Sequence, residues 1–466
     1  MIHRKVILLV GVSLTIVGGS HLISRGAPNF LRPGSLSIGL EDSLPGPRVK
    51  TAEELIEFWR GRFERDPRDF ISLTFLGQAF IRKARETGDI SAYERAEAAL
   101  RRALDLNPNY ESTLAYLATV LFAKHDFQGA LDLADRVYSF DPRALQALAT
   151  LGDAHLELGN YLEAEAAYRQ LLDRSPSSPV YSRLARLAWL RGRPEEALDL
   201  MQQAADEAKE SGLSGENTAW YQVQLGELYF TTGRYPEAAE YYAAALGAFD
   251  NYYLALAGLG KVRAAQGHYA EAIAFYRQTI AIIPQPEFVA ALGDIYAITG
   301  QASQAQQEYR LVEYIGKLAA INQIIYNRRL ALFYADHDVK LEEALELAAR
   351  ELEVRQDIYG YDALAWALYK NGRYAQAAEA IAEAMQLGTR DALLYYHAGM
   401  IYAGLGDHQG ARRMLTEALS INPRFDPLQS RIAALTLQQI NAALPRSLSS
   451  SRIALDKWSG NPRWLK

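Results

Sequence analysis

The sequence contains no cysteine among its 466 residues. This absence excludes disulfides, thiolate metal sites, iron–sulfur clusters and cysteine nucleophiles. Positive charge is not in excess either, because 49 Lys and Arg stand against 55 Asp and Glu, for a net charge of −6. A chain without a positive field does not gather phosphates in bulk, so we expect no nucleic acid among its partners.

Motifs for metal binding and catalysis are also missing. The eight histidines include no His-Glu-x-x-His spacing, and neither Gly-x-Ser-x-Gly nor Gly-x-Gly-x-x-Gly occurs. Residues 258–262 (GLGKV) resemble a phosphate loop but lack the four-residue gap and the Ser or Thr after the lysine. The pairs Glu195-Glu196 and Glu342-Glu343 are adjacent in sequence, and adjacent residues on a helix do not face one another. The sequence therefore predicts a protein that is not an enzyme, with no cofactor, no metal site and no small-molecule substrate.

Long hydrophobic runs are scarce, and one stands at the N-terminus. Arg4 and Lys5 precede an apolar run from Val6 to Gly19, and a span extended to Ile23 would include His21. The pattern predicts a signal anchor or a signal peptide over residues 1–25, with inner-membrane attachment through residues 6–23. The basic start favours repeats on the extracytoplasmic side of a bacterial inner membrane, and a secreted or periplasmic protein is the alternative. Residues 26–50 are rich in proline and glycine and read as a flexible linker.

The rest of the chain is dominated by an internal repeat. Small residues recur mostly every 33 or 34 residues, at Gly77, Ala118, Gly152, Ala185, Gly226, Gly260, Gly293, Ala331, Ala365 and Gly399. Each is followed by an alanine, at Ala96, Ala130, Ala164, Ala197, Ala238, Ala272, Ala305, Ala344, Ala377 and Ala411. Small residues at facing positions allow two helices to approach closely, so this column predicts paired helices, with Gly152 facing Ala164 and Gly399 facing Ala411.

Helix ends are marked between these positions. Seven glycines suit the left-handed residue that ends a first helix, at Gly159, Gly192, Gly233, Gly267, Gly300, Gly372 and Gly406. Five prolines are placed to close the second helix, at Pro108, Pro142, Pro176, Pro284 and Pro423. Both signals predict helical hairpins of nearly constant length.

These residues resemble the tetratricopeptide repeat, as the unit Ala147–Pro176 shows with Gly152, Ala164, Tyr168 and Pro176. The resemblance covers about residues 52–425. It implies an all-α fold: a right-handed α-solenoid of about ten helical hairpins over residues 51–427. A capping helix over residues 428–444 and a disordered basic tail over residues 445–466 are expected to follow. Residues 358–427 look like the closing repeats of many bacterial tetratricopeptide proteins, which implies a bacterial origin.

Three insertions interrupt the period, within residues 83–93, 206–217 and 314–329. Insertions can carry function, and they can also simply lengthen helices. The segment Tyr314–Arg329 contains no proline, which favours a prolonged helix there.

The resemblance also implies where a partner binds, because the family lines its inner face with first-helix residues at fixed offsets from the small residue. Here aromatic side chains concentrate at these offsets in repeats nine and ten, with a second cluster in repeats four and five. The predicted groove is formed by Trp189, Trp220, Phe230, Arg328, Tyr359, Trp366, Tyr369 and Tyr396. The lysines and asparagines with which chaperone-binding members clamp a carboxylate are missing. Aromatic anchors suit an apolar helix or an extended peptide, whereas the alternative is that they pack against neighbouring repeats.

The sequence as a whole predicts a non-enzymatic, membrane-anchored scaffold that binds a protein or peptide partner in its concave groove. A soluble exported or cytoplasmic adaptor for the assembly of an envelope, pilus or polysaccharide machine is the alternative. Neither prediction identifies the partner.

Overall fold

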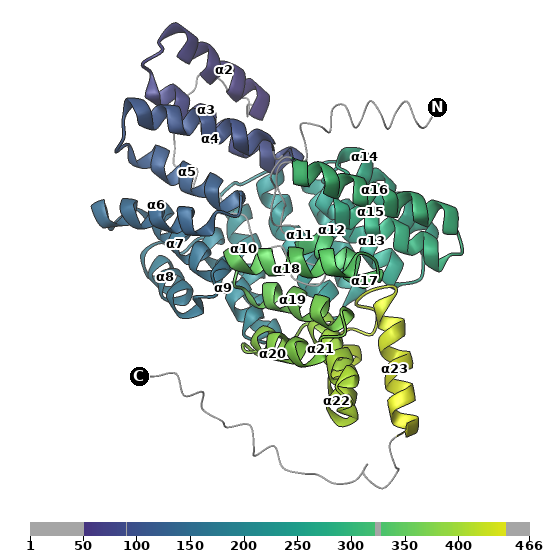
Figure 1. Ribbon diagram of the computed structural model, residues 1–466. Helices are drawn as coiled ribbons and strands as arrows, with labels where there is room; N and C mark the ends of the chain where they lie inside the picture. The colour runs from purple at the N-terminus through teal and green to yellow at the C-terminus, as the bar shows by residue number, and fades with distance from the viewer. Residues whose placement is uncertain (1–50, 90, 322–327, 444–466) are drawn as a thin grey trace, which may run out of the picture.

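The computed structural model describes residues 51–89, 91–321 and 328–443. The predicted anchor (1–25), linker (26–50) and basic tail (445–466) lie outside these residues. Within them the secondary structure is helical, with no strand, and the helices are labelled α2 to α23 in Figure 1. The prediction of an all-α fold is therefore confirmed.

Ten helical hairpins follow one another along the chain, each formed by a first helix, A, and a second helix, B. Hairpins 1 to 5 comprise α3 (Phe70–Thr87) with α4 (Ser91–Leu106), α5 (Glu111–Ala123) with α6 (Phe127–Phe140), α7 (Leu145–Glu157) with α8 (Tyr161–Arg174), α9 (Ser178–Leu190) with α10 (Pro194–Glu210), and α11 (Glu216–Thr231) with α12 (Tyr235–Ala248). Hairpins 6 to 10 comprise α13 (Tyr253–Ala265) with α14 (Tyr269–Ile282), α15 (Pro286–Ile298) with α16 (Ala302–Ile321), α17 (Arg328–Asp336) with α18 (Leu341–Val354), α19 (Ile358–Lys370) with α20 (Tyr374–Ala384), and α21 (Ala392–Gly404) with α22 (His408–Ile421).

The column of small residues lies at the interface between the two helices of each hairpin. All ten fixed alanines are buried, with exposed fractions of 0–3%. The facing arrangement differs in detail from the sequence-based expectation, because the glycines oppose the residue four positions after the alanine rather than the alanine itself. A Cβ on Gly152 would lie 2.5 Å from the ring of Tyr168, and one on Gly399 would lie 2.6 Å from Leu415. The large side chain of helix B therefore fills the space that the missing side chain of helix A leaves.

The predicted helix ends are confirmed. The seven glycines between helices A and B have positive φ angles of 66° to 81°, which a residue with a Cβ adopts only at a cost. Each of the five prolines stands two residues after the end of a B helix, as Pro142 does after α6 and Pro176 after α8.

The insertions lengthen helices. α3 has 18 residues, α10 has 17 and α16 has 20, against 13 or 14 in most of the others. The prolonged helix predicted near Tyr314 is therefore present in α16.

Among the described residues, two helices stand outside the ten hairpins. α2 (Ala52–Arg65) packs Leu55, Ile56 and Trp59 against hairpin 1, as a B helix of a preceding repeat would. α23 (Gln429–Ala443) follows hairpin 10, in the segment for which the sequence predicts a capping helix. The repeat pattern did not reveal α2, because this helix carries neither the small residue nor the fixed alanine.

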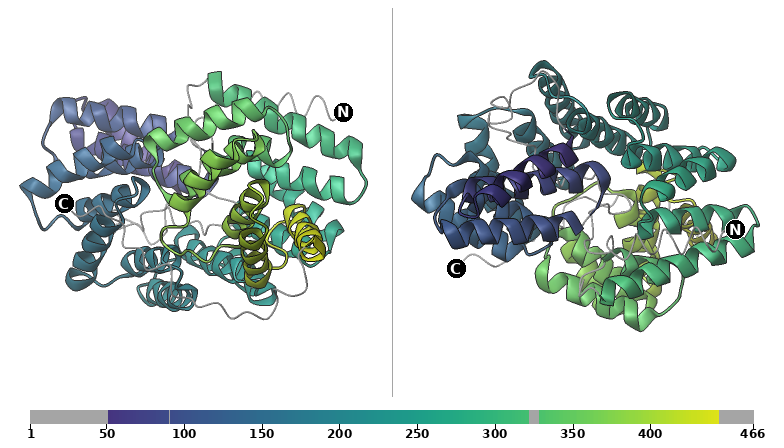
Figure 2. Two further views of the ribbon diagram at one scale, coloured as in Figure 1. Left: turned by 60° about the horizontal axis from the view of Figure 1, so that its bottom comes forward. Right: turned by 90° about the horizontal axis from the view of Figure 1, so that it is seen from above.

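The hairpins wind around a common axis, and late hairpins come to lie beside early ones. In Figure 1, α18 and α19 lie beside α9 and α10, and Figure 2 shows the same arrangement from two other directions. Residues separated by 159 to 199 positions in the chain are thereby in direct contact.

Candidate functional site

The residues predicted to line a groove are mostly buried. The exposed fractions are 1% for Trp189, 3% for Trp220, 3% for Phe230, 9% for Arg328, 8% for Tyr359, 1% for Trp366 and 1% for Tyr396. Tyr369 is half-buried. These side chains belong to separate parts of the fold, so they do not form one continuous surface.

Trp189 and Tyr359 meet across the solenoid. The indole Nε1 of Trp189 donates to the hydroxyl of Tyr359 over 3.0 Å, and that hydroxyl lies 3.4 Å from a carboxylate oxygen of Asp391. Asp391 also caps α21 by accepting from the backbone N–H of Leu393. Complete burial, together with the nearby charge of Asp362, raises the pKa of Asp391 to about 7. The two aromatic residues thus bind each other rather than an open groove.

Trp366, Tyr369 and Tyr396 form a second group, inside the last hairpins. Trp366 stacks on His397 with ring centroids 4.2 Å apart and on Tyr369 at 5.0 Å. Its indole N–H donates to Asp336 over 2.9 Å. Trp220 belongs to the core between hairpins 4 and 5, where it packs edge-on against Tyr221. These four aromatic side chains therefore pack against other residues of the chain.

Arg328 belongs to a buried cluster of charges. Its guanidinium donates to Asp357 over 3.0 Å, and Arg355 donates to Glu157 over 2.5 Å. Arg186 donates to the other oxygen of Glu157, also over 2.5 Å. Burial alone would raise the pKa of Asp357, but the charges of Arg328 and Arg355 hold it below its usual range.

The contact of Arg355 with Glu157 belongs to a series of contacts that we name the inter-turn seam. In this seam, the turn between helices A and B of one hairpin touches the loop before a later helix A. The turn of hairpin 3 (157–161) meets the loop before hairpin 9 (355–358), and the turn of hairpin 4 meets the loop before hairpin 10. The turn of hairpin 5 meets residues 421–424, before α23. One turn of the superhelix therefore takes about six hairpins in this part of the chain.

Backbone groups at helix ends supply much of the seam. Thr389 donates to the carbonyl of Leu190, Asn422 donates to that of Phe230 over 2.7 Å, and Arg424 donates to that of Ala265 over 2.6 Å. These carbonyls lie in the last turns of α9, α11 and α13, where a helix offers no N–H four residues further along; that of Phe230 also accepts from the backbone N–H of Gly233 over 2.9 Å. The seam therefore caps the A helices from another part of the chain.

Sequence reasoning missed the seam because most of its residues lie outside the repeating columns and its register depends on the superhelix. One signal was present in the loops before hairpins 9 and 10. These loops contain Arg355, Asp357 and Thr389 and lack the proline that follows several other B helices. That signal marks unusual loops without indicating what they contact.

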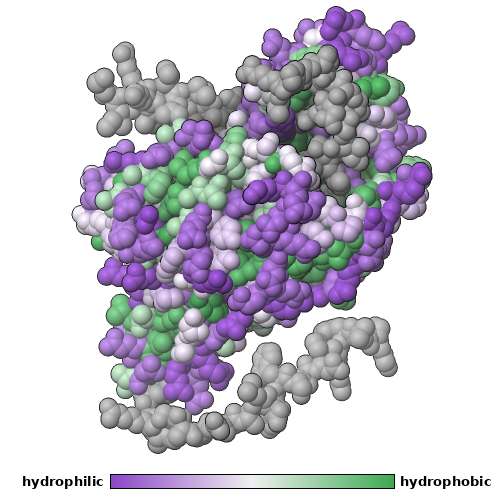
Figure 3. Space-filling view, turned by 180° about the vertical axis from the view of Figure 1, so that it is seen from behind, coloured by the Kyte–Doolittle hydropathy of each residue, from purple (hydrophilic) through white to green (hydrophobic). Residues whose placement is uncertain are grey.

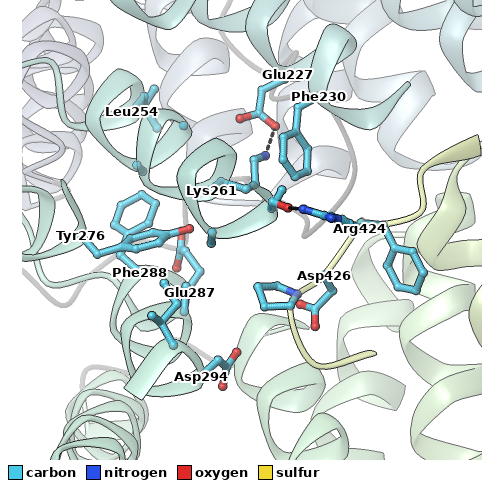
Figure 4. A pocket seen from close by; sticks show the side chains of 18 of the residues that line it. Glu227, Phe230, Leu254, Lys261, Tyr276, Glu287, Phe288, Asp294, Arg424 and Asp426 are labelled. Carbon is cyan, nitrogen blue, oxygen red and sulfur yellow. Dashed lines mark hydrogen bonds and ion pairs between the residues drawn. The ribbon is translucent and has the colours of Figure 1, made fainter. Parts of the chain in front are cut away.

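A pocket remains open on the inner side of hairpins 5 to 8, and of the predicted residues only Phe230 lines it. Its volume is about 100 Å³. The pocket is lined by Val223, Glu227, Phe230, Leu254, Ala257, Gly258, Lys261, Ala264, Ala265, Tyr276, Glu287, Phe288, Ala291, Asp294, Ile295, Arg329, Arg424, Phe425, Asp426 and Pro427. In Figure 4, Tyr276, Glu287 and Phe288 lie on one side and Phe230 and Arg424 on the other.

Charged side chains around the pocket are paired with one another. Lys261 contacts Glu227 over 2.5 Å and lies over the ring of Phe230. Arg329 pairs with Glu287 over 2.9 Å. Positive and negative charges are thus interleaved, and no charge of one sign is collected to bind an anion or a cation.

Other charged groups of the pocket have structural partners. Asp294 accepts from Tyr309 over 3.0 Å and contacts His337 over 2.7 Å. Asp426 accepts the backbone N–H groups of Leu428 and Gln429 at the start of α23. The surface left for a ligand is therefore mainly the apolar walls formed by residues such as Phe230, Leu254 and Phe288.

Between residues 51 and 443, apart from the gaps at 90 and 322–327, no group of three or more His, Asp or Glu residues could hold a metal ion. No helix in the same part of the chain is long and apolar enough to cross a membrane. The predicted anchor at residues 6–23 lies outside the residues that the structure describes.

The geometry defines the chain as an α-solenoid of paired helices. Two family models, both described as tetratricopeptide repeat, match residues 178–251 and residues 117–179, 223–287 and 363–427. Together they cover about half of the chain, so the chain belongs to the tetratricopeptide repeat family.

Individual relatives are distant. The chain is 27% identical over 221 residues to human protein O-mannosyl-transferase TMTC1, a match that covers 46% of this chain and 24% of that protein. It resembles the solved structure of the APC/C hetero-tetramer Cut9-Hcn1, with 15% identity, a TM-score of 0.32, and 83% of this chain and 93% of that chain covered. A tetratricopeptide repeat protein from Parabacteroides merdae matches with 17% identity and a TM-score of 0.39, over 55% of this chain and all of that chain.

Proposed function

We propose that this chain is a non-enzymatic scaffold that binds an extended peptide of a partner protein, with an apolar side chain of the peptide in the pocket between hairpins 5 and 8. The observation that carries the proposal is the pocket itself. Its charged groups have partners within the chain, and its remaining walls are apolar. Tetratricopeptide repeats generally serve as protein-binding surfaces, and this pocket is a place among hairpins 5 to 8 where a side chain can enter.

The size and chemistry of the pocket favour one kind of ligand group. A site that admits a water molecule needs roughly 10–15 Å³ by the same measure, so about 100 Å³ has room for one large apolar side chain. A phosphate or a carboxylate would require a cluster of free cationic groups, whereas Lys261 and Arg329 each have a carboxylate within 3 Å. A leucine, isoleucine, methionine or phenylalanine of a peptide fits this environment.

Filling the pocket tests this proposal. Peptides selected from a random display library on the purified full chain should share an apolar anchor residue. Ala291, which lines the pocket, becomes Trp in the test variant, and Ala375, exposed at the start of α20, becomes Trp in the control. Ala291→Trp should weaken the selected peptides at least about 30-fold, or about 2 kcal/mol, in a fluorescence-anisotropy titration. Equal affinities for the two variants would place the binding surface elsewhere.

We further propose that residues 6–23 attach the chain to the bacterial inner membrane and that the repeats lie on the extracytoplasmic side. The basic start at Arg4 and Lys5 and the apolar run after it support this orientation. Alkaline phosphatase joined after Lys466 should be active in cells, because the enzyme folds only outside the cytoplasm. Reporter activity restricted to a cytoplasmic-type fusion would contradict the proposal.

A further inference from the structure

One wall of the pocket comes from a part of the chain far from the others. Residues 424–427, in the loop between α22 and α23, line the pocket together with helices of hairpins 5 to 8. In Figure 4, Arg424 lies across the pocket from Tyr276. The loop is 192 positions from hairpin 5 in the sequence, counted from Asn422 to Phe230. The pocket is therefore complete only where one superhelical turn meets the next.

The side chain of Asn422 joins this loop to hairpin 5. Its amide N–H donates to the carbonyl of Phe230 over 2.7 Å, and its amide oxygen accepts from the hydroxyl of Tyr235. The same oxygen accepts the backbone N–H of Arg424 over 3.0 Å, at the edge of the pocket. Asn422 is 1% exposed and does not line the pocket. It therefore acts on a ligand in the pocket only through the position of the loop.

A further hydrogen bond ties the loop to hairpin 6, where the seam becomes sparse. The guanidinium of Arg424 donates to the carbonyl of Ala265 over 2.6 Å. A Cβ on Gly233, in the turn of hairpin 5, would lie 3.2 Å from the carbonyl oxygen of Ile421, whereas no described residue lies within 4 Å of a Cβ on Gly267, in the turn of hairpin 6. Segments with few contacts open locally at a low free energy. We therefore expect this loop to open more readily than the charged seam between hairpins 3 and 9.

The other end of the loop is attached to the last part of the solenoid. The ring of Phe425 lies 5.5 Å from that of Tyr396 in hairpin 10. Asp426 accepts the backbone N–H groups of Leu428 and Gln429, each over 2.9 Å, where α23 begins. These contacts hold the loop to hairpin 10 and α23, so they do not by themselves place it against hairpins 5 and 6.

We propose that Asn422 is a positioning residue of the peptide pocket, which holds the loop of residues 422–427 against hairpin 5, and that a bound peptide in turn holds this loop closed. This inference rests on the proposed peptide site. A peptide that touches both the helices and the loop binds the closed arrangement better than an open one, so it shifts the population toward the closed state. The coupling is reciprocal, because a change that favours the open loop must also weaken the peptide.

Peptide affinity in the purified full chain tests the role of Asn422. Asn422→Ala removes both hydrogen bonds to hairpin 5 and changes no wall of the pocket. Peptides selected on the natural chain should bind this variant at least about ten-fold more weakly in a fluorescence-anisotropy titration. Tyr235→Phe, which loses the hydroxyl alone, should weaken them about three-fold. Thr389→Ala is the matched control, because Thr389 donates to a carbonyl of the seam between hairpins 4 and 10 and lies outside the pocket. Equal losses for Thr389→Ala and Asn422→Ala would overturn the proposal.

Amide hydrogen exchange measures the reciprocal effect on the loop. A saturating selected peptide should slow exchange over residues 424–429 at least about ten-fold, including the N–H of Arg424 that donates to Asn422. Exchange over residues 387–393, at the corresponding loop before hairpin 10, should not change. If the peptide protects the pocket helices and leaves residues 424–429 unprotected, it does not engage the loop and the proposal is wrong.

A last variant separates this inference from the peptide site on which it rests. α23 follows the loop directly and offers another apolar surface, since Leu435 is 59% and Ile432 is 44% exposed. Figure 3, from behind, shows hydrophobic surface at the lower left, where α23 lies. Leu435→Lys should leave the affinity unchanged. Weaker binding with Leu435→Lys and none with Ala291→Trp would contradict the peptide site itself, whereas weaker binding with Ala291→Trp and unchanged binding with Asn422→Ala would retain that site and overturn the role of Asn422.

Discussion

Arg355 donates a hydrogen bond to Glu157 across 198 residues of sequence, and both side chains are almost completely excluded from solvent. The two residues belong to successive turns of the superhelix. A solenoid in which each repeat touches its neighbours alone would have no such contact. The inter-turn seam therefore makes the stability of the early hairpins depend on the late ones.

Removing one partner of this buried pair should be costly. Arg355→Leu leaves Glu157 and Asp357 buried with fewer cations, and such losses typically cost about 3–5 kcal/mol. The free energy of unfolding in urea, followed by helical circular dichroism, would measure the loss. Arg350→Leu is the control, since Arg350 pairs with Glu346 at the surface over 3.8 Å. That pair should contribute less than about 0.5 kcal/mol.

Substitutions at two glycines distinguish the effect of backbone strain from the effect of contact across the seam. Gly192 and Gly267 have φ angles of 66° and 81°, so alanine at either position carries a similar left-handed penalty of about 1–2 kcal/mol. A Cβ on Gly192 would run into the carbonyl oxygen of Gly388, whereas nothing lies within 4 Å of a Cβ on Gly267. Gly192→Ala should therefore lower the melting temperature clearly more than Gly267→Ala. Equal decreases would show that the seam between hairpins 4 and 10 is not closed in solution.

The alanine column can be tested on α20. Ala377 is fully buried, whereas Ala375 on the same helix is exposed. Ala377→Leu should destabilise the protein by about 1–3 kcal/mol, because the added methyl groups have no space between the paired helices. Ala375→Leu should change the free energy of unfolding by less than about 0.5 kcal/mol. Similar effects of the two changes in thermal melts would contradict the packing of this hairpin.

Stability should depend on pH through Asp391. Its pKa is raised to about 7 in the folded chain, whereas an unfolded aspartate titrates near pH 3.9. Between these values the folded state binds more protons, so the contribution of Asp391 to the free energy of unfolding falls as the pH rises from about 4 to about 7. Asp391→Asn does not titrate and should gain stability relative to the natural chain over this window, by up to about 4 kcal/mol.

Urea titrations at pH 4.5 and pH 7.5 would measure this difference. Asp407→Asn is the matched control, because Asp407 caps α22 with an exposed carboxylate and the change preserves capping in the same way. If the stability difference between Asp391→Asn and the natural chain is the same at both pH values, burial does not perturb Asp391.

The contacts of Trp366 are structural. Its truncation should therefore lower the stability of the fold, and not only the affinity for a peptide. Trp366→Ala removes the stacking on His397 and the hydrogen bond to Asp336, and such truncations cost about 3–5 kcal/mol. Tyr374→Ala, at a position 39% exposed, should cost clearly less. A Trp366→Ala variant that melts normally but fails to bind peptides selected on the natural chain would restore the groove predicted from the sequence.

The sequence predicts the hairpins well because local rules determine them. A glycine such as Gly159 ends helix A, a proline such as Pro176 follows helix B, and the alanines between them fix how closely the two helices approach. These signals act within one repeat, so a single sequence displays them.

Contacts between superhelical turns could not be predicted in the same way. Trp189 occupies a helix-A position that faces the inside of the solenoid. Whether its side chain meets a partner protein or Tyr359 depends on the pitch of the superhelix. That pitch is the sum of small rotations from one hairpin to the next. The pocket depends on the same sum, because its walls come from four hairpins and from residues 424–427. Phe230 was therefore the one predicted groove residue that the structure places there.

Closed contacts between superhelical turns change the mechanics of the molecule. A solenoid with separated turns extends under tension like a spring, since each hairpin rotates slightly and little is broken. Here, pulling the ends apart must first break the buried ion pair of Glu157 with Arg355 and the hydrogen bond of Phe230 with Asn422. We therefore expect a stiff response followed by an abrupt yield, as in a coil whose windings are joined.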